Sequence, residues 1–261
     1  TSKRGTQQDS THNPADGLED YFTLAHLHQI KKEGLNEKDK EVLTQLLENS
    51  NAKNEKYIIA KLAQIDLSLS AIYLHNRIGR KISNETRTLL IADKIVENND
   101  GTLNGTIPFG LSALSENWLL ISDRGAWKLP NSGTGIIVQN VGTIGLKSGE
   151  PQYIELQNVT AEKITHGGFE QLISEEISLF LEATIAAGEY LVNKSTEHAT
   201  GRIQFPNLFQ DEYGHDGIIK FGAVKSLLSH MLCRLETLKA VKNSNIPPVM
   251  LYLQAGKWLG T

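Results

Sequence analysis

The chain has 261 residues, of which 39% are hydrophobic and 21% are charged, and its formal net charge is −4. This composition is ordinary for a globular protein built from one large domain or a few smaller ones. The slight acidic excess argues against a dedicated nucleic-acid-binding protein, because such proteins usually carry a basic excess. A single cysteine, Cys233, excludes an intrachain disulfide framework and a cysteine-based zinc site.

The first 17 residues, TSKRGTQQDSTHNPADG, contain no apolar core and no secretory signal. We expect residues 1–17 to form a disordered leader. No apolar run approaches the roughly 18 residues that a membrane-spanning helix needs. The sequence therefore predicts a protein without a membrane span, and the lone cysteine fits a reducing compartment, so that we expect a cytoplasmic location.

Helical periodicity dominates residues 18–92, which we assign to an N-terminal helical domain. One helix is predicted to end at Gly34, and the next to begin after Asn36 as its N-cap and to stop before Asn51. A third and longest helix is expected over residues 55–79, with Gly79 as its end. Its apolar residues recur every three or four positions, which places one apolar stripe on one face.

The pattern changes at Asp93, and residues 93–166 are predicted to form a small central β domain. The stretch NNDGTLNGT is rich in turn residues. ENWLLISD, GTGIIVQNV and PQYIELQNV are short apolar or alternating runs bounded by Gly, Pro, Asn and Asp.

Residues 167–261 are predicted to form a C-terminal helical domain. Two long helices, on either side of the stretch His198–Gly217, should pair in antiparallel fashion, although Gly188 weakens the middle of the first. In the second helix we expect the apolar residues to share one face, and Cys233 to be a small buried side chain. The predicted fold class is α+β: N-terminal helices, a central β-sheet or barrel domain, and a C-terminal antiparallel helical bundle.

The first long helix ends in the sequence GRIQF, which places Arg202 and Phe205 three residues apart. Two interpretations are open. Arg202 is either a solvated helix-end residue favoured by the helix dipole, with Phe205 in the core, or the pair binds a ligand that carries both phosphate and an aromatic ring. A guanidinium fork matches phosphate oxygens, and an aromatic face suits a purine.

Five stretches, in order along residues 57–242, resemble the flavin-dependent acyl-CoA dehydrogenase family. AKLAQIDLSLSAIYLHNRIG resembles the N-terminal-domain helix under the active site, and DGTLNGTIPF resembles the hairpin DGYVLNGTKMWITN. Residues 144–164 are similar to LGxRxSxxxxLxFxDVxVPxExL, residues 195–205 to AxxRxQFG, and residues 220–241 to FQxVQxxLADMxxxLEAARxLV. In the order and spacing of all five, the sequence resembles this family.

The resemblance implies FAD as cofactor and an acyl-CoA thioester as substrate, oxidised at its α and β carbons. It implies that Arg202 contacts the FAD pyrophosphate and Phe205 the adenine, in a site completed across a subunit interface. Phe109 and Ser112 occupy the positions of the flavin-contacting WITN motif. A homo-oligomer, dimer or tetramer, and an electron-transfer partner are further implications; we expect no metal and no nucleic acid.

The sequence also departs from the family pattern. The strand and loop of the type FALTEPxAGSD have no counterpart before DGTLNGT, the WITN threonine is replaced by Leu111, and the FQ glutamine by Gly222. The segment with the YEGT-type catalytic glutamate has no counterpart in the 261 residues. Two alternatives therefore accompany the dehydrogenase interpretation: a non-catalytic structural or binding homologue that has lost the flavin cradle, and a flavin-dependent monooxygenase on the same scaffold.

Glu176 is the base that the resemblance implies, because some family members carry the glutamate about seven turns before the RxQF arginine. Such a base works best in a closed apolar pocket that raises its pKa. The residues alone favour another interpretation, in which Glu175 and Glu176 face solvent in the first turn of a helix. The sequence contains no G-x-G-x-x-G after a strand and no G-x-S-x-G, so it indicates neither a Rossmann site nor serine hydrolase chemistry.

Overall fold

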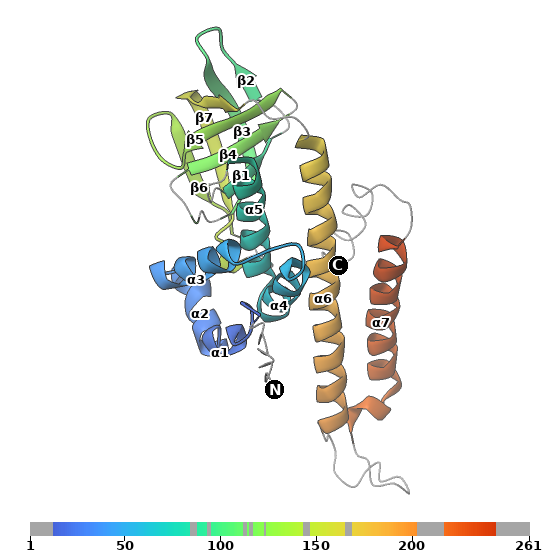
Figure 1. The fold of residues 1–261 in the computed structure, drawn as a ribbon. Coiled ribbons are helices and arrows are strands. Elements are labelled where there is room, and N and C mark those ends of the chain that lie inside the picture. Colours follow the sequence, from blue (N-terminus) through green and yellow to red (C-terminus); the bar gives the residue numbers. More distant parts are fainter. Residues whose placement is uncertain are drawn as a thin grey trace, which may run out of the picture.

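The structure is a computed structural model that describes residues 13–83, 88–92, 95–111, 114, 117–122, 124–142, 147–164, 169–202 and 217–243. It has the predicted α+β architecture: N-terminal helices, a β domain, and two long C-terminal helices (Figure 1). The long helix α6 runs alongside α4 and α5 and then extends beyond them to pair with α7 (Figure 1).

The described N-terminal helices are α1 (Leu18–Tyr21), α2 (Leu24–Glu33), α3 (Glu37–Glu48), α4 (Glu55–Ile65) and α5 (Leu67–Ser83). The predicted end of α2 at Gly34 and the predicted bounds of α3 are confirmed. Gly34 caps α2 with a φ of 81°, a backbone conformation that favours glycine. Asn36 and Asp39 form a reciprocal capping box at the start of α3.

The single long helix that we predicted over residues 55–79 is wrong in two respects. It is broken at Asp66, whose backbone is extended, with φ −158° and ψ 123°. The carboxylate of Asp66 accepts hydrogen bonds from the backbone of Ser68 and the hydroxyl of Ser148, which favours a new helix start over continuation. In addition, α5 continues through Gly79 to Ser83, because Gly79 is buried in tertiary packing and does not end the helix.

The β domain consists of two four-stranded sheets in the order β1-β4-β5-β8 and β2-β3-β7-β6. The strands are β1 (Thr88–Ile91), β2 (Ile95–Glu97), β3 (Thr102–Gly110), β4 (Asn117–Ser122), β5 (Gly125–Pro130), β6 (Ile136–Asn140), β7 (Gln152–Thr160) and β8 (Glu162–Ile164), with a short 3-10 turn, η1 (Lys147–Gly149), before β7. The apolar side chains of the two sheets, including Trp118 and Trp127, form a common core.

Strand β1 corrects the prediction that the chain has no strand before DGTLNGT and that residues up to 92 are helical. TLLI reads as an apolar run that fits a helix or a buried strand equally well. Parallel pairing with β4, Thr88 to Trp118 through Ile91 to Ile121, decides the matter in favour of a strand. Only residues 92–94 connect β1 to β2.

The sheet that contains β1 also carries apolar side chains on its other face, where α5 packs against it. Leu89, Leu119 and Ile121 lie in one cluster with Ile78 of α5, whereas Leu90 and Leu120 face the second sheet. This alternation is the period of two that a strand buried on both faces requires. The β domain is thus attached to the helices through β1 and α5.

The C-terminal elements are α6 (Phe169–Gly201), the 3-10 turn η2 (Ile218–Lys220) and α7 (Gly222–Lys242). Helices α6 and α7 pair in antiparallel fashion, as predicted (Figure 1). Gly188 does not interrupt α6; a Cβ at this position would lie 3.2 Å from the Leu235 side chain, so glycine lets the two helices approach closely.

Helix α7 buries only part of the stripe that we predicted. Leu235 and Leu238 are buried against α6, but Leu227 and Leu232 are 65% and 48% exposed. The prediction that Cys233 is buried is wrong, because it lies two residues from Leu235 and therefore on the opposite side of the helix. None of the described helices is long and apolar enough to span a membrane.

Candidate functional site

Glu176 lies two turns into α6 and is buried, with 6% of its surface exposed. The interpretation that it faces solvent in the first turn of a helix is therefore wrong. The physical reason is its spacing from Leu179 and Ala183, because residues three and seven positions apart share one helix face. Leu179 and Ala183 belong to the helical core between α6, α4 and α5, and Glu176 continues their stripe.

Histidine 75 of α5 links Glu176 to the β domain. The Nε2 atom of His75 lies 3.5 Å from Glu176 Oε1, and its Nδ1 lies 3.1 Å from the carbonyl oxygen of Leu89 in β1. A carbonyl oxygen only accepts hydrogen bonds, so Nδ1 carries the proton. Nε2 is then available to accept a proton from the Glu176 carboxyl, or to donate to its carboxylate when the imidazole is charged.

His75 was missed by the sequence analysis. Its signal was present: a titratable side chain three residues after Ile72, inside the apolar stripe of α5. Neither periodicity nor the family motifs indicate, however, that the glutamate of another helix lies opposite it. That proximity arises from the packing of α5 on α6.

Burial raises the pKa of Glu176, and the positive charges of His75 and Arg77 oppose this effect. Its second oxygen, Oε2, is buried and has no hydrogen-bond partner among the described residues. A raised pKa makes the carboxylate a stronger base, and a free oxygen can receive a proton, which are properties that suit general acid–base catalysis.

The adjacent Glu175 behaves in the opposite way. Burial acts to raise its pKa, but hydrogen bonds from Lys81 and Arg77, at 2.6 and 2.7 Å, together outweigh burial and lower it. Glu175 is thus held as a carboxylate in an ion-pair network. The pKa values of two consecutive glutamates on α6 are therefore shifted in opposite directions, because their side chains contact different neighbours.

The end of strand β3 reaches the junction between the β domain and the helices. Leu111 is buried in the helical core, and a Cβ on Gly110 would lie 3.0 Å from Leu90 of β1. Phe109, which we predicted to contact the flavin, is 38% exposed, and Ile91 at the end of β1 is 41% exposed. By the alternation of β1, Ile91 lies on the α5 side of its sheet with Leu89, whereas Phe109 belongs to the second sheet. The predicted flavin contact of Phe109 stays a prediction.

Arg202 is exposed at the end of α6. Its carbonyl oxygen accepts a hydrogen bond from the backbone of Ile218, at 2.9 Å, which ties this end of α6 to η2. Glu176 and Arg202 are 26 residues apart on a continuous helix, and so about 39 Å apart along its axis. The structure does not bring these two predicted site residues together within one chain. Ser112 and Phe205 lie outside the described residues.

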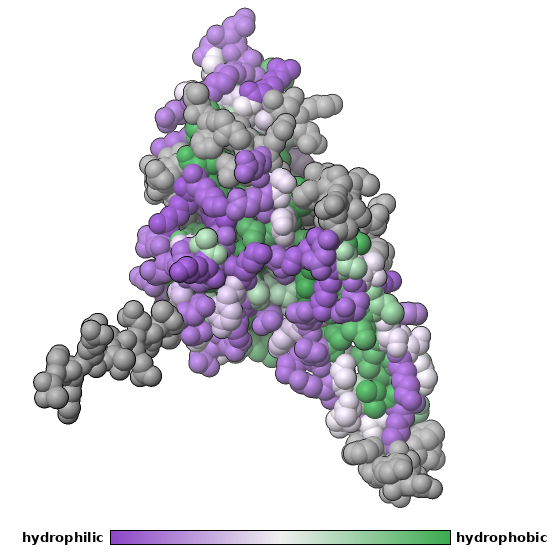
Figure 2. Space-filling model, turned by 45° about the vertical axis from the view of Figure 1, so that its right-hand side comes forward, coloured by the Kyte–Doolittle hydropathy of each residue, from purple (hydrophilic) through white to green (hydrophobic). Residues whose placement is uncertain are grey.

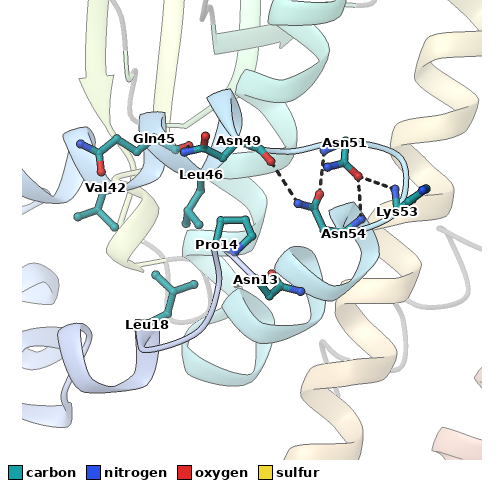
Figure 3. Close-up of a pocket in the computed structure, with 10 residues that line it drawn as sticks. All are labelled: Asn13, Pro14, Leu18, Val42, Gln45, Leu46, Asn49, Asn51, Lys53 and Asn54. Atoms are coloured by element: carbon teal, nitrogen blue, oxygen red, sulfur yellow. Dashed lines mark hydrogen bonds between the residues drawn. The ribbon is translucent and has the colours of Figure 1, made fainter. Parts of the chain in front are cut away.

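A cavity of about 820 Å³ lies away from Glu176, among the N-terminal helices (Figure 3). Its wall contains asparagines from the 49–54 turn whose side chains are engaged in hydrogen bonds within that turn (Figure 3). The lining of this cavity contains none of the predicted site residues. Among the described residues there is no group of three or more His, Cys, Asp or Glu side chains that could hold a metal ion.

No protein-family model and no curated protein sequence matches this chain. Solved structures, by contrast, match nearly all of it. The steroid ACAD Tcur3481-Tcur3483 is 12% identical with a TM-score of 0.67, over 94% of this chain and 80% of that one. An acyl-CoA dehydrogenase from Slackia heliotrinireducens is 17% identical with a TM-score of 0.60, over 95% and 84% of the two chains.

TdsC from Paenibacillus sp. A11-2, solved with FMN and indole, is 13% identical with a TM-score of 0.62, over 94% of this chain and 81% of TdsC. These identities are too low to transfer a reaction, but the agreement in fold extends over all three parts of the molecule. The chain has the fold of the acyl-CoA dehydrogenases.

Proposed function

We propose that this protein is an acyl-CoA dehydrogenase-like flavoprotein that oxidises an acyl-CoA thioester at its α and β carbons, with FAD as hydride acceptor. The observation that carries the proposal is the buried Glu176 on this fold, at the junction of α5, α6 and β1, with a raised pKa and an oxygen that has no hydrogen-bond partner among the described residues. A buried carboxyl of this kind lowers the stability of the fold, and proteins keep such groups mainly where they have a function.

In the proposed mechanism Glu176 removes the α-proton of the thioester. The C–H electron pair forms the α,β double bond as hydride leaves the β-carbon, and the proton remains on the Glu176 carboxyl. FAD supplies the acceptor for that hydride when it is bound. His75 is a positioning residue: fixed by the Leu89 carbonyl, its Nε2 faces Glu176 Oε1 and keeps Oε2 as the reacting oxygen.

The cofactor's other end is proposed to contact Arg202, and Phe205, of a second copy of the chain. The 26-residue separation of Glu176 and Arg202 supports this arrangement, because one FAD cannot reach both residues of the same helix. A partner surface is available on the α6–α7 pair, where Tyr190, Leu191, Leu227 and Leu232 are exposed. Figure 2 shows apolar side chains along this pair. We propose a homo-oligomer, which then passes its electrons to a separate acceptor.

The absorption spectrum of the purified protein tests the flavin. Oxidised flavin bands, present on isolation or after addition of FAD, are the expected result. Anaerobic addition of acyl-CoA thioesters of several chain lengths should then bleach the longest-wavelength band, because the reduced flavin lacks it. A protein that remains colourless in the presence of excess FAD contradicts the proposal.

Glu176→Gln tests the base. The amide keeps the size of the side chain but takes no proton, so we expect the rate of flavin reduction by acyl-CoA to fall by at least about 100-fold, with FAD binding retained. Glu197→Gln is the matched control, because Glu197 is an exposed residue about 30 Å farther along the same helix. Equal reduction rates in Glu176→Gln and wild type would remove Glu176 from the mechanism.

Two features favour an alternative. Strand β1 ends at Ile91 and β2 already begins at Ile95, and the position of the family's threonine is taken by Leu111, which is buried in the helical core. Both features fit a non-catalytic homologue that keeps the scaffold without the flavin, and failure to bind FAD would select it. A flavin-dependent monooxygenase is selected if flavin binds but acyl-CoA does not bleach it.

A further inference from the structure

A second polar cavity, of about 390 Å³, lies beside Glu175, on the side of α5 away from His75. Arg77 and Arg80 share that side because they are three residues apart, whereas His75 is two residues from Arg77. The lining residues come from the end of α3, the turn that follows it, α4, α5 and α6: Leu47, Ser50, Asn51, Ala52, Glu55, Arg77, Arg80, Lys81 and Glu175.

Arg77 is the central charge of this cavity and is only 4% exposed. Its Nη2 contacts Glu55 Oε2 and Glu175 Oε1, both at 2.7 Å, and its Nε pairs with the other oxygen of Glu55. The same Glu175 oxygen binds Lys81 Nζ at 2.6 Å. Within the lining, Glu55 therefore pairs with Arg77, and Glu175 pairs with both Arg77 and Lys81.

Donors remain after this pairing. The Nη1 atoms of Arg77 and Arg80 are both buried and have no hydrogen-bond partner among the described residues. The lining contains three cationic side chains and two carboxylates, so its formal charge is about +1 at neutral pH. A buried guanidinium nitrogen without an acceptor is unfavourable, and one bound anion would supply both the acceptor and the missing charge.

The part of the wall that the 49–54 turn contributes is held by hydrogen bonds within that turn. Asn51 Oδ1 accepts hydrogen bonds from the backbone N–H of Lys53 and Asn54, and the Asn51 N–H donates to Asn54 Oδ1 (Figure 3). Asn54 Nδ2 donates to the carbonyl oxygen of Asn49, which closes the turn. A preformed wall lowers the entropy that a ligand loses on binding.

We propose that this cavity binds a small organic anion that carries a carboxylate or a phosphate group. Arg77 and Arg80 bind its oxygens, Lys81 adds charge, and Leu47 and Ala52 contact its apolar part. The volume exceeds that of an inorganic ion and lies in the range of small-molecule sites, and guanidinium groups suit both oxyanions. The site is separate from the proposed oxidation at Glu176, and its test needs no flavin.

Thermal unfolding of the full chain tests this proposal, with acetate, inorganic phosphate and glycerol 3-phosphate as probes. Chloride keeps the ionic strength constant in each series, because screening alone changes surface electrostatics. We expect the midpoint temperature to rise along a saturable binding curve for at least one probe. Acetate and phosphate distinguish the carboxylate from the phosphate form, and glycerol 3-phosphate measures the gain from an organic portion.

Arg80→Gln should weaken the apparent affinity at least about tenfold, because it removes a charged donor that no described carboxylate occupies. Lys81→Gln provides a second variant should Arg80→Gln fold poorly, with weakening in the same direction. Lys194→Gln, at an exposed lysine on α6 that pairs with Glu197, should leave the affinity unchanged. The proposal is overturned if no probe gives a saturable rise, or if the folded cavity variants bind as tightly as wild type.

Discussion

The two halves of α6 have opposite surroundings. The half from Phe169 to Gly188 lies against α4 and α5 and contributes Leu179, Ala183 and the buried Glu176 to one continuous core. Among the described residues, the half from Glu189 to Gly201 packs mainly on α7 and η2, and it leaves Tyr190 and Leu191 exposed before the exposed Arg202.

This difference shows how the proposed site is divided. The half that holds Glu176 is complete within one chain, because the core fixes its neighbours. The half that holds Arg202 presents apolar and cationic side chains to a surface, which is what an interface residue does before its partner binds. In the proposed arrangement the same helix therefore carries both an internal site and a contact to a second copy of the chain.

The largest expected effect is a difference in the free energy of unfolding between variants in the two halves of α6. Leu179→Ala should lower the free energy of unfolding by about 2–5 kcal/mol, because it opens a cavity in the helical core. Leu191→Ala, at a residue that is 55% exposed, should change it by less than about 0.5 kcal/mol. Urea denaturation at low protein concentration measures both. Similar losses in the two variants would mean that the halves do not differ.

The second effect concerns assembly. Leu232→Glu places a charge on the exposed face of α7. Burying this charge in an interface costs desolvation free energy, so the dissociation constant of the oligomer should rise about 100-fold while the monomer stays folded. Sedimentation velocity over a concentration series measures it. Thr237→Glu, at an exposed position of the same helix about 140° around its axis from Leu232, is the control. A wild-type chain that is already monomeric contradicts the proposed interface.

A smaller effect is expected at the end of α6. Arg202→Gln should weaken FAD binding about tenfold, as expected for the loss of one charged contact to phosphate, with little change in stability because Arg202 is exposed. Fluorescence titration of the flavin-free protein with FAD and with riboflavin measures it. Riboflavin has no pyrophosphate, so its affinity should not respond; equal loss for both ligands would argue for a general structural role.

The last and smallest effect compares how the stability contributions of Glu175 and Glu176 change with pH, which we expect to have opposite signs. The pKa of Glu176 is raised above its ordinary value of 4.5, so its contribution to stability is present below pH 4.5 and is lost as pH rises through the raised pKa. The pKa of Glu175 is lowered, so its contribution is present above pH 4.5 and is lost as pH falls through the lowered pKa.

Relative to wild type, Glu176→Gln should therefore gain stability as pH rises from 4.5, whereas Glu175→Gln should lose it. Both variants should approach wild type at pH values well below 4.5, where the carboxyl groups are protonated in the folded and unfolded states. Urea unfolding at several pH values measures these differences. Parallel trends in the two variants would show that Glu175 and Glu176 share one environment.

Local signals explain why much of the fold was predictable. The glycine cap of α2, the Asn36 box of α3 and the turn before β3 depend on a few neighbouring residues, so the sequence indicated them directly. Strand β1 and the break at Asp66 were not predictable in this way. TLLI has no periodicity of its own, and Asp66 receives part of its hydrogen bonding from Ser148, which lies 82 residues away.

For the candidate site, too, some features were predictable from the sequence and others depend on tertiary packing. By itself the sequence determined the succession of N-terminal helices, β domain and C-terminal helices, and its resemblance to the family singled out Glu176 as a candidate. Only the tertiary structure decided that Glu176 is buried, that His75 faces it, and that Cys233 and Leu232 lie outside. The physical reason is that periodicity defines which residues share a face, whereas burial and pKa depend on which other element covers that face.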